Sequence, residues 1–301
     1  MNERLYARLV SWLGDDPVVV ASVIDSRGAT PRKAGSKMLI SAHSTAFSIG
    51  GGLAEARVIA AARALLASGD PVAMPLTIDL GGGSDAVGIC GGSMQLALRR
   101  WAGSDDRARA QQIANALHSG HRVGLSAAEL GSSDAGATLA PDDRLLIIGA
   151  GHCALALYTL ALTLDFDLWA FAETADGFAG NGFAKATQLH GDYQQLNRAF
   201  ATDRPVYVVL LNRAFPQDVA ALAALSQQQP RFIGMMGSPR RIHEVQQTLR
   251  RQGLPVPLLH APIGIELGAE TPEEIAVSIL AQLIQQRRQP PASSARLHGG
   301  K

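Results

Sequence analysis

The chain is poor in cysteine and in aromatic residues, and its charges nearly cancel. Of its 301 residues only two are cysteines, Cys90 and Cys153, and 5% are aromatic. Two cysteines cannot build a disulfide framework, which is typical of proteins from a reducing compartment. No apolar run approaches the ~20 residues that a membrane-spanning helix needs, and residues 1–13 have the spacing of a short amphipathic helix rather than of a signal peptide. We therefore expect a cytoplasmic protein without membrane contact.

Positive and negative charges are nearly equal in number in both halves of the chain. Residues 1–141 carry 13 basic and 12 acidic side chains, and residues 142–301 carry 14 of each. Nucleic acids and anionic membranes are bound by clustered lysine and arginine, so the composition argues against both. We expect the partner to be a small molecule or another protein. The length suits about two domains, and the hydrophobic share of 47% suffices for their cores.

The first part of the chain predicts an α+β domain over residues 1–103. Residues 18–24 and 37–40 are expected as strands and residues 53–66 as a helix. Residues 93–99 alternate polar and apolar side chains, which predicts a half-exposed strand. Residues 104–141 are rich in glycine and polar residues, and we expect a linker region with a helix at about 107–118.

The second part predicts an α/β fold, a Rossmann-like domain with a doubly wound parallel sheet over residues 142–288. Four apolar segments are expected as strands, with helices following them: 144–148, 167–172, 206–211 and 231–236. Strands that alternate with helices are typical of a parallel sheet. Residues 289–301 predict a disordered tail.

The first domain contains three glycine-rich turns, at residues 27–35, 50–52 and 88–92. The first of them carries Arg32 and Lys33 and is followed by Lys37, so it suits either a phosphate- or pterin-type anion or simple solvation. Cys90 stands among glycines that would leave its thiol accessible, and turn amides lower a thiol's pKa. A functional cysteine and a buried structural one both remain open, whereas zinc would need more ligands nearby.

The second domain opens with a pattern typical of dinucleotide-binding turns. Gly149-x-Gly151-x-x-Ala154 follows a strand and precedes a helix, and Glu173 ends the next strand. Such a turn places a pyrophosphate at a helix N-terminus, with the acid on a ribose. The pattern predicts a nucleotide-type phosphate site, the alternative being a Rossmann fold whose site is empty or repurposed. His152 would then donate to a phosphate, reach toward the first domain or merely cap the helix.

A second helix start carries an unusual charge. In Gly237-Ser238-Pro239-Arg240-Arg241, serine is expected as the N-cap and proline as the first helical residue. Two arginines there oppose the helix dipole. This conflict indicates either an anion site or a pair of solvated arginines. By contrast, Thr271 and Glu274 predict an ordinary capping box.

Taken together, these motifs resemble the xanthine dehydrogenase accessory proteins, the XdhC/CoxI family. The resemblance covers about residues 5–287 and rests on several motifs in the same order: 28–38, 49–55, 90–94, 149–152, 232–238, 260–264 and 268–276. The chain departs from the family pattern at Leu53-Ala54, at Ile89, at Thr174-Ala175 and at Asn212-Arg213.

The resemblance implies a chaperone for molybdenum cofactor that performs no turnover of its own. It would hold the cofactor, with or without a cytidine dinucleotide tail, while the terminal sulfur is installed. It would then promote insertion into a molybdenum hydroxylase of the xanthine dehydrogenase/aldehyde oxidase type. The implied partners are the large subunit of that apo-molybdoenzyme, a cysteine desulfurase and a second copy of the chain.

The resemblance and the motifs together assign eighteen cofactor-binding residues, and Cys90 among them would contact the molybdenum centre. They are Arg32, Lys33, Lys37, Gly50, Gly51, Gly52, Glu55, Cys90, Gly91, Gly92, Gly149, Gly151, His152, Glu173, Gly237, Ser238, Arg240 and Arg241. Two other functions stay open. One is an NAD(P)-dependent oxidoreductase that uses Gly149, Gly151 and Glu173; the other is an assembly scaffold without a ligand.

Overall fold

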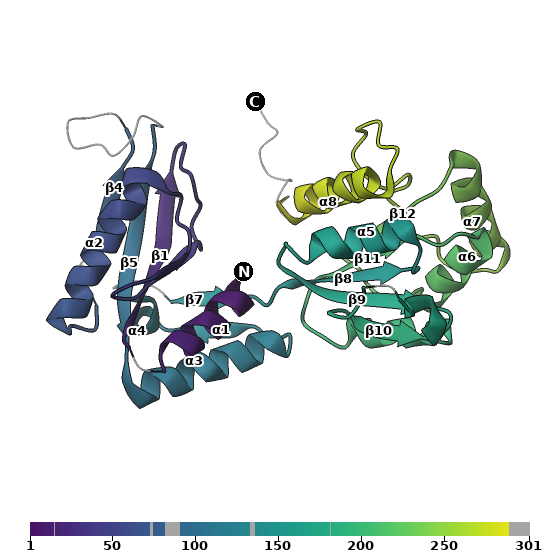
Figure 1. Cartoon of the computed structure of the whole chain (residues 1–301). Helices are drawn as coiled ribbons and strands as arrows, with labels where there is room; N and C mark the ends of the chain where they lie inside the picture. Colours follow the sequence, from purple (N-terminus) through teal and green to yellow (C-terminus); the bar gives the residue numbers. More distant parts are fainter. Residues whose placement is uncertain (15, 73–74, 82–90, 133–135, 181, 289–301) are drawn as a thin grey trace, which may run out of the picture. The chain divides into compact units, whose positions relative to one another are not determined.

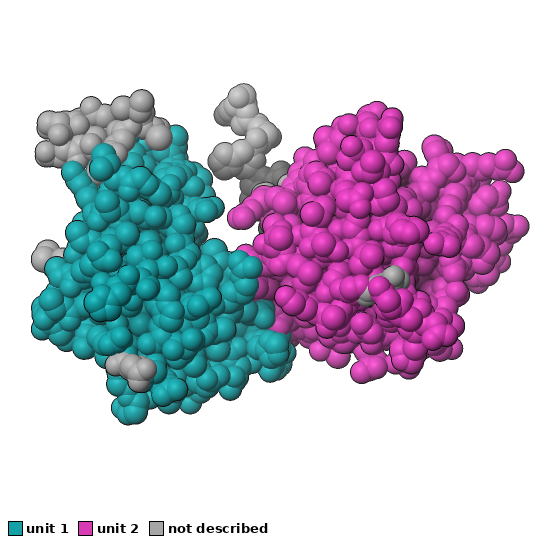
Figure 2. Space-filling model, in the orientation of Figure 1, with its two compact units in different colours: residues 1–141 teal, residues 142–301 magenta. Residues whose placement is uncertain are grey.

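The structure is a computed structural model that describes residues 1–14, 16–72, 75–81, 91–132, 136–180 and 182–288. The chain divides into two compact units, residues 1–141 and 142–301, which are coloured separately in Figure 2. The expected tail at 289–301 lies outside the described residues, as does Cys90. Within those ranges, no helix is both long enough and apolar enough to cross a membrane.

Unit 1 (residues 1–141) is built on an antiparallel sheet of five strands with the order β3-β2-β1-β5-β4 (Figure 1). The strands are β1 (Val18–Arg27), β2 (Lys37–Ile40), β3 (Thr45–Phe47), β4 (Leu76–Asp79) and β5 (Ser93–Trp101). Helix α2 (Gly52–Ser68) packs on one face, and helices α1 (Asn2–Trp12) and α3 (Gly103–His118) pack on the other. Because both faces are covered, β1 is apolar without alternation at its start.

Strand β5 is more buried than its alternating sequence predicts. Leu96, Ala97 and Leu98 are all fully buried. The reason is that β5 lies between β1 and β4 and has helices on both faces, so the half-exposed strand expected from the sequence is wrong.

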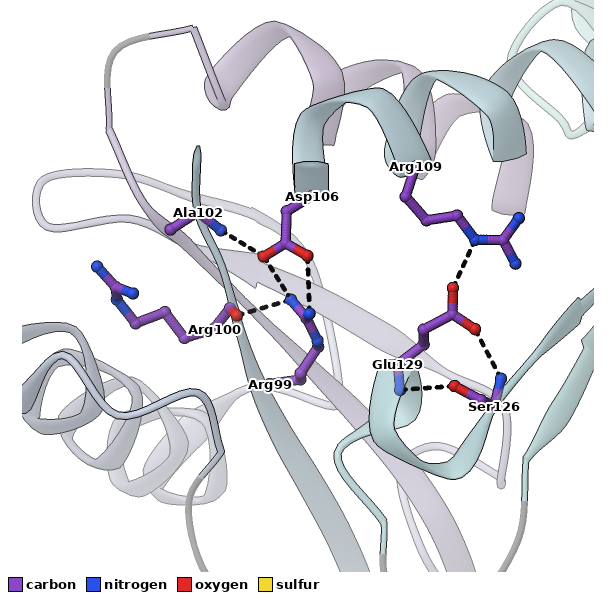
Figure 3. Close-up of polar contacts among 7 residues, drawn as sticks. All are labelled: Arg99, Arg100, Ala102, Asp106, Arg109, Ser126 and Glu129. Atoms are coloured by element: carbon purple, nitrogen blue, oxygen red, sulfur yellow. Dashed lines mark hydrogen bonds and ion pairs between the residues drawn. The ribbon is translucent and has the colours of Figure 1, made fainter. Parts of the chain in front are cut away.

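The segment expected as a linker region, 104–141, is instead an integral part of unit 1. Helix α3 packs along α1, and β6 (Val123–Leu125), α4 (Ala127–Leu130) and β7 (Ala137–Leu139) follow it. Figure 3 shows the ion pairs that join α3 to β5 and to α4. The carboxylate of Asp106 accepts from both terminal nitrogens of Arg99 and from the backbone N–H of Ala102. Arg109 pairs with Glu129, which forms a capping box with Ser126 at the start of α4.

Unit 2 (residues 142–301) has the expected parallel sheet, with the order β10-β9-β8-β11-β12 (Figure 1). The strands are β8 (Asp143–Ile148), β9 (Phe166–Ala172), β10 (Thr187–His190), β11 (Val206–Leu210) and β12 (Phe232–Met235). The chain starts in the middle, moves outward to β10 and returns to the other side of β8. The strand order therefore reverses between β8 and β11, which is the arrangement of a Rossmann fold.

Helices cover both faces of this sheet. Helices α5 (His152–Ala161) and α8 (Pro272–Arg288) pack on one face, and α6 (Phe215–Ala224) and α7 (Pro239–Arg251) pack on the other. Short 3-10 helices, η1 (Ala175–Phe178) and η2 (Tyr193–Phe200), take the place of a longer helix between β9 and β11. Double coverage explains why residues 145–148 of β8 and the whole of β11 are continuous apolar runs.

Candidate functional site

A cavity of about 220 Å³ opens at the carboxyl ends of β8, β9 and β11, next to the point where the strand order reverses. Open α/β sheets bind ligands at this position. The lining residues come from the segments that follow these strands and from η2 and α6: Gly149, Ala150, Gly151, Phe171, Ala172, Glu173, Gly177, Tyr193, Leu211, Asn212, Arg213 and Gln217. The structure thus brings together Gly149, Gly151 and Glu173, as the sequence predicts.

The two glycines of the turn have different physical roles. Gly149 has φ +119°, and a Cβ there would lie 2.7 Å from the carbonyl oxygen of Leu211. Gly151 has an ordinary extended conformation as the N-cap of α5, and a Cβ there would meet only the Nε of Arg213, at 3.9 Å. The fold therefore requires glycine at 149. Glycine at 151 instead leaves open space in the cavity beside the first backbone N–H groups of α5, which have no acceptor within the helix.

Glu173 lines the same cavity and is held there by two donors. Its Oε1 accepts from the Tyr193 hydroxyl at 3.1 Å, and its Oε2 accepts from Gln217 Nε2 at 2.6 Å. Burial, the hydrogen bond to Glu173 and the charges of Glu173 and Asp218 all raise the pKa of Tyr193 well above its usual range. Tyr193 consequently stays protonated and keeps donating. The carboxylate is oriented and still has acceptor positions free for a ligand.

The sequence predicts either an anion site or a pair of solvated arginines at the start of α7, and the structure shows neither for Arg241. Ser238 is the N-cap, and its hydroxyl accepts from the backbone N–H of Arg241 at 3.3 Å, which confirms the expected helix start. The guanidinium of Arg241 donates through Nε and Nη2 to Oδ2 of Asp218, which is fully buried. The anion that pairs with Arg241 is therefore the protein's own carboxylate, which resolves the conflict with the helix dipole.

The same guanidinium supports the cavity wall from behind. Its Nη1 donates to the carbonyl of Arg213 at 2.9 Å, and its Nη2 donates to that of Asn212 at 2.8 Å. The Asn212 side chain in turn donates to Oδ1 of Asp218 at 2.9 Å. Neither Arg240, which is exposed, nor Gly237 lines the cavity. His152 is exposed at the first position of α5 and does not line it either.

Sequence reasoning misses the cavity residues Tyr193, Arg213 and Gln217. Arg213 follows β11 as the glycine turn follows β8, and parallel neighbours end at the same edge of the sheet. That signal needs the strand order, which the sequence alone does not reveal. Tyr193 lies on a 3-10 helix whose apolar residues recur at helical spacing, but that spacing does not show that the tyrosine hydroxyl reaches the cavity.

In unit 1 the turns at 27–35 and 50–52 and the described end of the third turn, Gly91-Gly92, converge. A Cβ on Gly28 would lie 2.8 Å from the carbonyl oxygen of Gly91, and one on Gly92 would overlap the carbonyls of Arg27 and Ala29. A Cβ on Gly50 would overlap the ring of Pro31. The turn at 27–35 therefore packs backbone to backbone against Gly91-Gly92 and also contacts the turn at 50–52. We call this arrangement the glycine-turn cluster.

Two ionisable candidates in this cluster serve the turns themselves. Oε1 of Glu55 accepts from the Ser48 hydroxyl at 2.6 Å and from the backbone N–H groups of Ile49 and Gly51 at 3.0 Å. Burial alone would raise the pKa of Glu55, but these hydrogen bonds outweigh it and hold the pKa below its usual value. Lys37 is buried, donates to the carbonyl of Gly35 at 3.0 Å, and has its pKa lowered by burial.

The cationic side chains at the cluster surface are Arg32 and Lys33. Both are exposed, and Lys33 Nζ donates to the carbonyl of Gly28 at 3.3 Å. Gly91 and Gly92 pair with Leu80 through backbone hydrogen bonds at 2.8 Å, next to the segment that carries Cys90. The proposed role of Cys90 stays a prediction. The described part of the chain holds no group of three or more His, Cys, Asp or Glu side chains suited to a metal ion.

Fold and sites define a two-unit protein with a Rossmann pocket in one unit and convergent glycine turns in the other. The family comparisons agree with both halves: residues 145–283 match the XdhC Rossmann domain, and residues 12–78 match the XdhC and CoxI family. The chain belongs to the XdhC and CoxI family.

Two relatives support this assignment. The chain is 29% identical over 280 residues to the uncharacterized protein YqeB of Escherichia coli (strain K12), covering 91% of this chain and 44% of YqeB. It is 30% identical over 149 residues to a probable xanthine dehydrogenase subunit of Bacillus subtilis (strain 168), covering 49% of this chain and 44% of that protein. The chain thus matches less than half the length of either relative.

A solved structure shares the fold over nearly the full length. A crystal structure of a xanthine dehydrogenase from Bacillus halodurans superimposes with a TM-score of 0.80, covers 98% of each chain and is 22% identical. At this identity the likeness concerns the fold alone.

Proposed function

We propose that the chain is an accessory protein of a molybdenum hydroxylase of the xanthine dehydrogenase type and that its cargo is molybdenum cofactor. Family membership supports the accessory role, as does the Bacillus subtilis relative, whose name is that of a probable xanthine dehydrogenase component. The pterin would be held at the glycine-turn cluster of unit 1, and the pocket of unit 2 would be a separate site for a nucleotide.

The observation that carries the proposal is the glycine-turn cluster. The carbonyl of Gly91 lies where a Cβ on Gly28 would clash, and the carbonyls of Arg27 and Ala29 lie where a Cβ on Gly92 would clash, so the turns meet backbone to backbone. Within the same turn the Thr30 hydroxyl oxygen is buried and has no hydrogen-bond partner among the described residues. Leaving a buried hydroxyl unpaired is unfavourable, so a polar ligand atom is a fitting partner. Arg32 and Lys33 add positive charge for an anionic pterin phosphate.

In this proposal the protein is a carrier rather than a catalyst. Cys90 adjoins the glycine pair of the cluster in sequence, and its thiolate would contact the molybdenum centre or its sulfur. Installation of the terminal sulfur by a cysteine desulfurase and transfer to the apo-molybdoenzyme would follow while the cargo is held. A dimer of the chain would be the working form.

The direct test compares protein purified from cells that make molybdenum cofactor with protein from cells that cannot. Molybdenum content and the fluorescence of the oxidised pterin are measured on both samples. We expect about one pterin per chain from competent cells and none from deficient cells. Equal pterin content in the two samples would refute the proposal.

Thr30→Val separates cargo binding from folding. Valine has nearly the same shape and removes an unpaired buried hydroxyl, so the free energy of unfolding should stay equal or rise. Retained pterin should nevertheless fall by about tenfold if the hydroxyl bonds the cargo. Pterin retention equal to that of the wild type would assign Thr30 a purely structural position. Arg63→Gln, which removes an exposed charge from α2, is the matched control.

Cys90→Ala tests the cysteine. The substitution is small and should leave the fold intact, while cofactor retention or maturation of the target enzyme falls. A folded variant that retains cofactor and matures its target at the wild-type level would show that Cys90 is structural.

The pocket of unit 2 supports a second candidate, an NAD(P)-dependent oxidoreductase, because the glycine turn and Glu173 meet there. This candidate predicts turnover of a nicotinamide cofactor by protein that lacks pterin. It gives no role to the glycine-turn cluster.

A further inference from the structure

We propose that the pocket of unit 2 is a ribonucleotide site in which Arg213 binds the phosphate and Glu173 binds the unsubstituted ribose. The inference rests on the proposed function only insofar as both place a nucleotide in unit 2. It assigns a phosphate-binding residue that the glycine pattern does not reveal, and it defines which nucleotides the pocket accepts.

The phosphate end lies between the glycine turn and the loop after β11. Arg213 Nε is the atom nearest to the open Cβ position of Gly151, so the guanidinium lies beside the first turn of α5. Among the described residues that line the cavity, Arg213 is the only cation. Its planar guanidinium can donate two parallel hydrogen bonds to phosphate oxygens, beside the amides of the helix start.

The backbone of Arg213 is fixed although its side chain is exposed. Arg241 donates to the carbonyls of both Asn212 and Arg213 and is itself held by the buried Asp218. Asp218 and Arg241 are therefore positioning residues for the phosphate end. Their pairing keeps the loop in place, which lowers the ordering cost of binding.

The ribose end is defined by the oriented carboxylate of Glu173. Tyr193 and Gln217 each occupy one acceptor position, and the remaining positions accept hydroxyl donors such as the 2′- and 3′-OH of a ribose. A 2′-phosphate would instead bring two anions together. The cation of the cavity, Arg213, lies beside Gly151, where it is assigned to the 5′-side phosphate. The pocket should consequently reject ribose that is phosphorylated at the 2′ position.

The size of the cavity limits what it encloses. About 220 Å³ is below the ~300–1,000 Å³ of typical small-molecule pockets, so it holds a ribose and a phosphate but not a whole dinucleotide. The base and any second nucleotide then lie outside. The site should therefore discriminate weakly between adenine and cytosine.

The test is calorimetric titration of the full chain with ADP, CDP, 2′-deoxy-ADP and adenosine 2′,5′-bisphosphate. ADP and CDP should bind with similar affinity, and the two other compounds about tenfold or more weakly. Arg213→Gln should weaken ADP binding by about tenfold or more, whereas Arg250→Gln, an exposed charge at the far end of α7, should not. Glu173→Gln should reduce the discrimination against the 2′-phosphate.

Three results would overturn the inference: no ADP binding by the folded protein, wild-type ADP affinity in Arg213→Gln, or tighter binding of the bisphosphate than of ADP. These outcomes are separable from failure of the proposed function. If ADP does not bind but pterin is retained, only the ribonucleotide site is wrong. If ADP binds as expected and pterin is absent from protein made in competent cells, the proposed cargo is wrong and the ribonucleotide site stands.

Discussion

Replacing Arg241 with glutamine should destabilise unit 2 by about 3 kcal/mol near neutral pH. The substitution removes both donors to Oδ2 of Asp218 and leaves a fully buried carboxylate that keeps the hydrogen bond from the Asn212 amide. Breaking one partner out of a buried ion pair typically costs about 3–5 kcal/mol. We expect the lower end because the side chain of Arg241 is 19% exposed, so water reaches part of the pair.

The loss of stability in the Arg241 variant should depend on pH, because Asp218 changes its charge with pH. Burial raises the pKa of Asp218, although hydrogen bonds from Asn212 and Arg241 and the Arg241 charge lower it. The folded protein therefore takes up this proton at a higher pH than the unfolded chain does. The free energy of unfolding therefore falls as the pH rises from the pKa of Asp218 in the unfolded chain to its higher pKa in the folded protein. Without Arg241 that pKa rises further, so the deficit of the variant shrinks as the pH falls through it.

The assay is hydrogen exchange followed by mass spectrometry as a function of urea. Peptides from β11 and α6 report on unit 2, and peptides from unit 1 serve as an internal control. Measurements near neutral pH and at about pH 5 give the two deficits. Adding Asp218→Asn to the Arg241 variant removes the uncompensated charge and should recover part of the loss. An equal deficit at both pH values, together with no recovery in the double variant, would refute the reasoning.

Three further predictions concern the glycine turn and Glu55. Gly149→Ala should lower the stability of unit 2 by about 1–3 kcal/mol, measured by the same exchange, because of its φ of +119° and the carbonyl of Leu211. Gly151→Val should cost less than about 1 kcal/mol but weaken ADP binding in titrations more than Glu173→Ala does, since a side chain there blocks the phosphate. Glu55→Gln should cost unit 1 about 2 kcal/mol near neutral pH. Because the folded pKa of Glu55 is lowered, this stabilisation is lost as the pH falls through that pKa, and a deficit that persists in acid would contradict it.

The parallel sheet of unit 2 is predictable because its central strands have a simple sequence pattern. Residues 145–148 and 206–210 are uninterrupted apolar runs, since helices cover both faces of the sheet. Strand β10 escapes prediction because Thr187–His190 has a single buried residue, Leu189, and lies at the edge of the sheet. Strand β12 lies at the other edge but is predicted, because all four of its residues are buried, so local pattern identifies buried strands better than exposed ones.

The boundary of the first unit is misplaced by sequence reasoning for a different reason. Residues 104–141 have the polar, glycine-rich composition of a linker, and their attachment to the sheet depends on contacts distant in sequence. Arg109 meets Glu129 twenty positions later, and Leu117 packs with Leu5 in the same core. Composition cannot show such pairings, which are evident only once α1 and α3 are seen to share one face.

The candidate site shows the same division. Gly149, Gly151 and Glu173 can be identified because each stands at a fixed position relative to a strand end. Arg241 stands out in the sequence as an anomaly at a helix start, but its anion is Asp218, 23 positions earlier. The unusual arginine therefore holds the loop at Asn212-Arg213 in place and does not itself line the pocket.

The structure also sorts the glycines into those that can and those that cannot test ligand binding. At Gly28, Gly92 and Gly149 a Cβ would strike a backbone carbonyl, so any substitution damages the fold before it reaches a ligand. At Gly151 φ is negative and the space is open toward Arg213, whereas Gly51 has φ +81°, so a side chain there is strained although nothing lies within 4 Å of its Cβ. Loss of binding after a change at the first three positions therefore carries no information about the ligand. The informative position is Gly151, where the fold requires neither a positive φ nor the space that a side chain would fill.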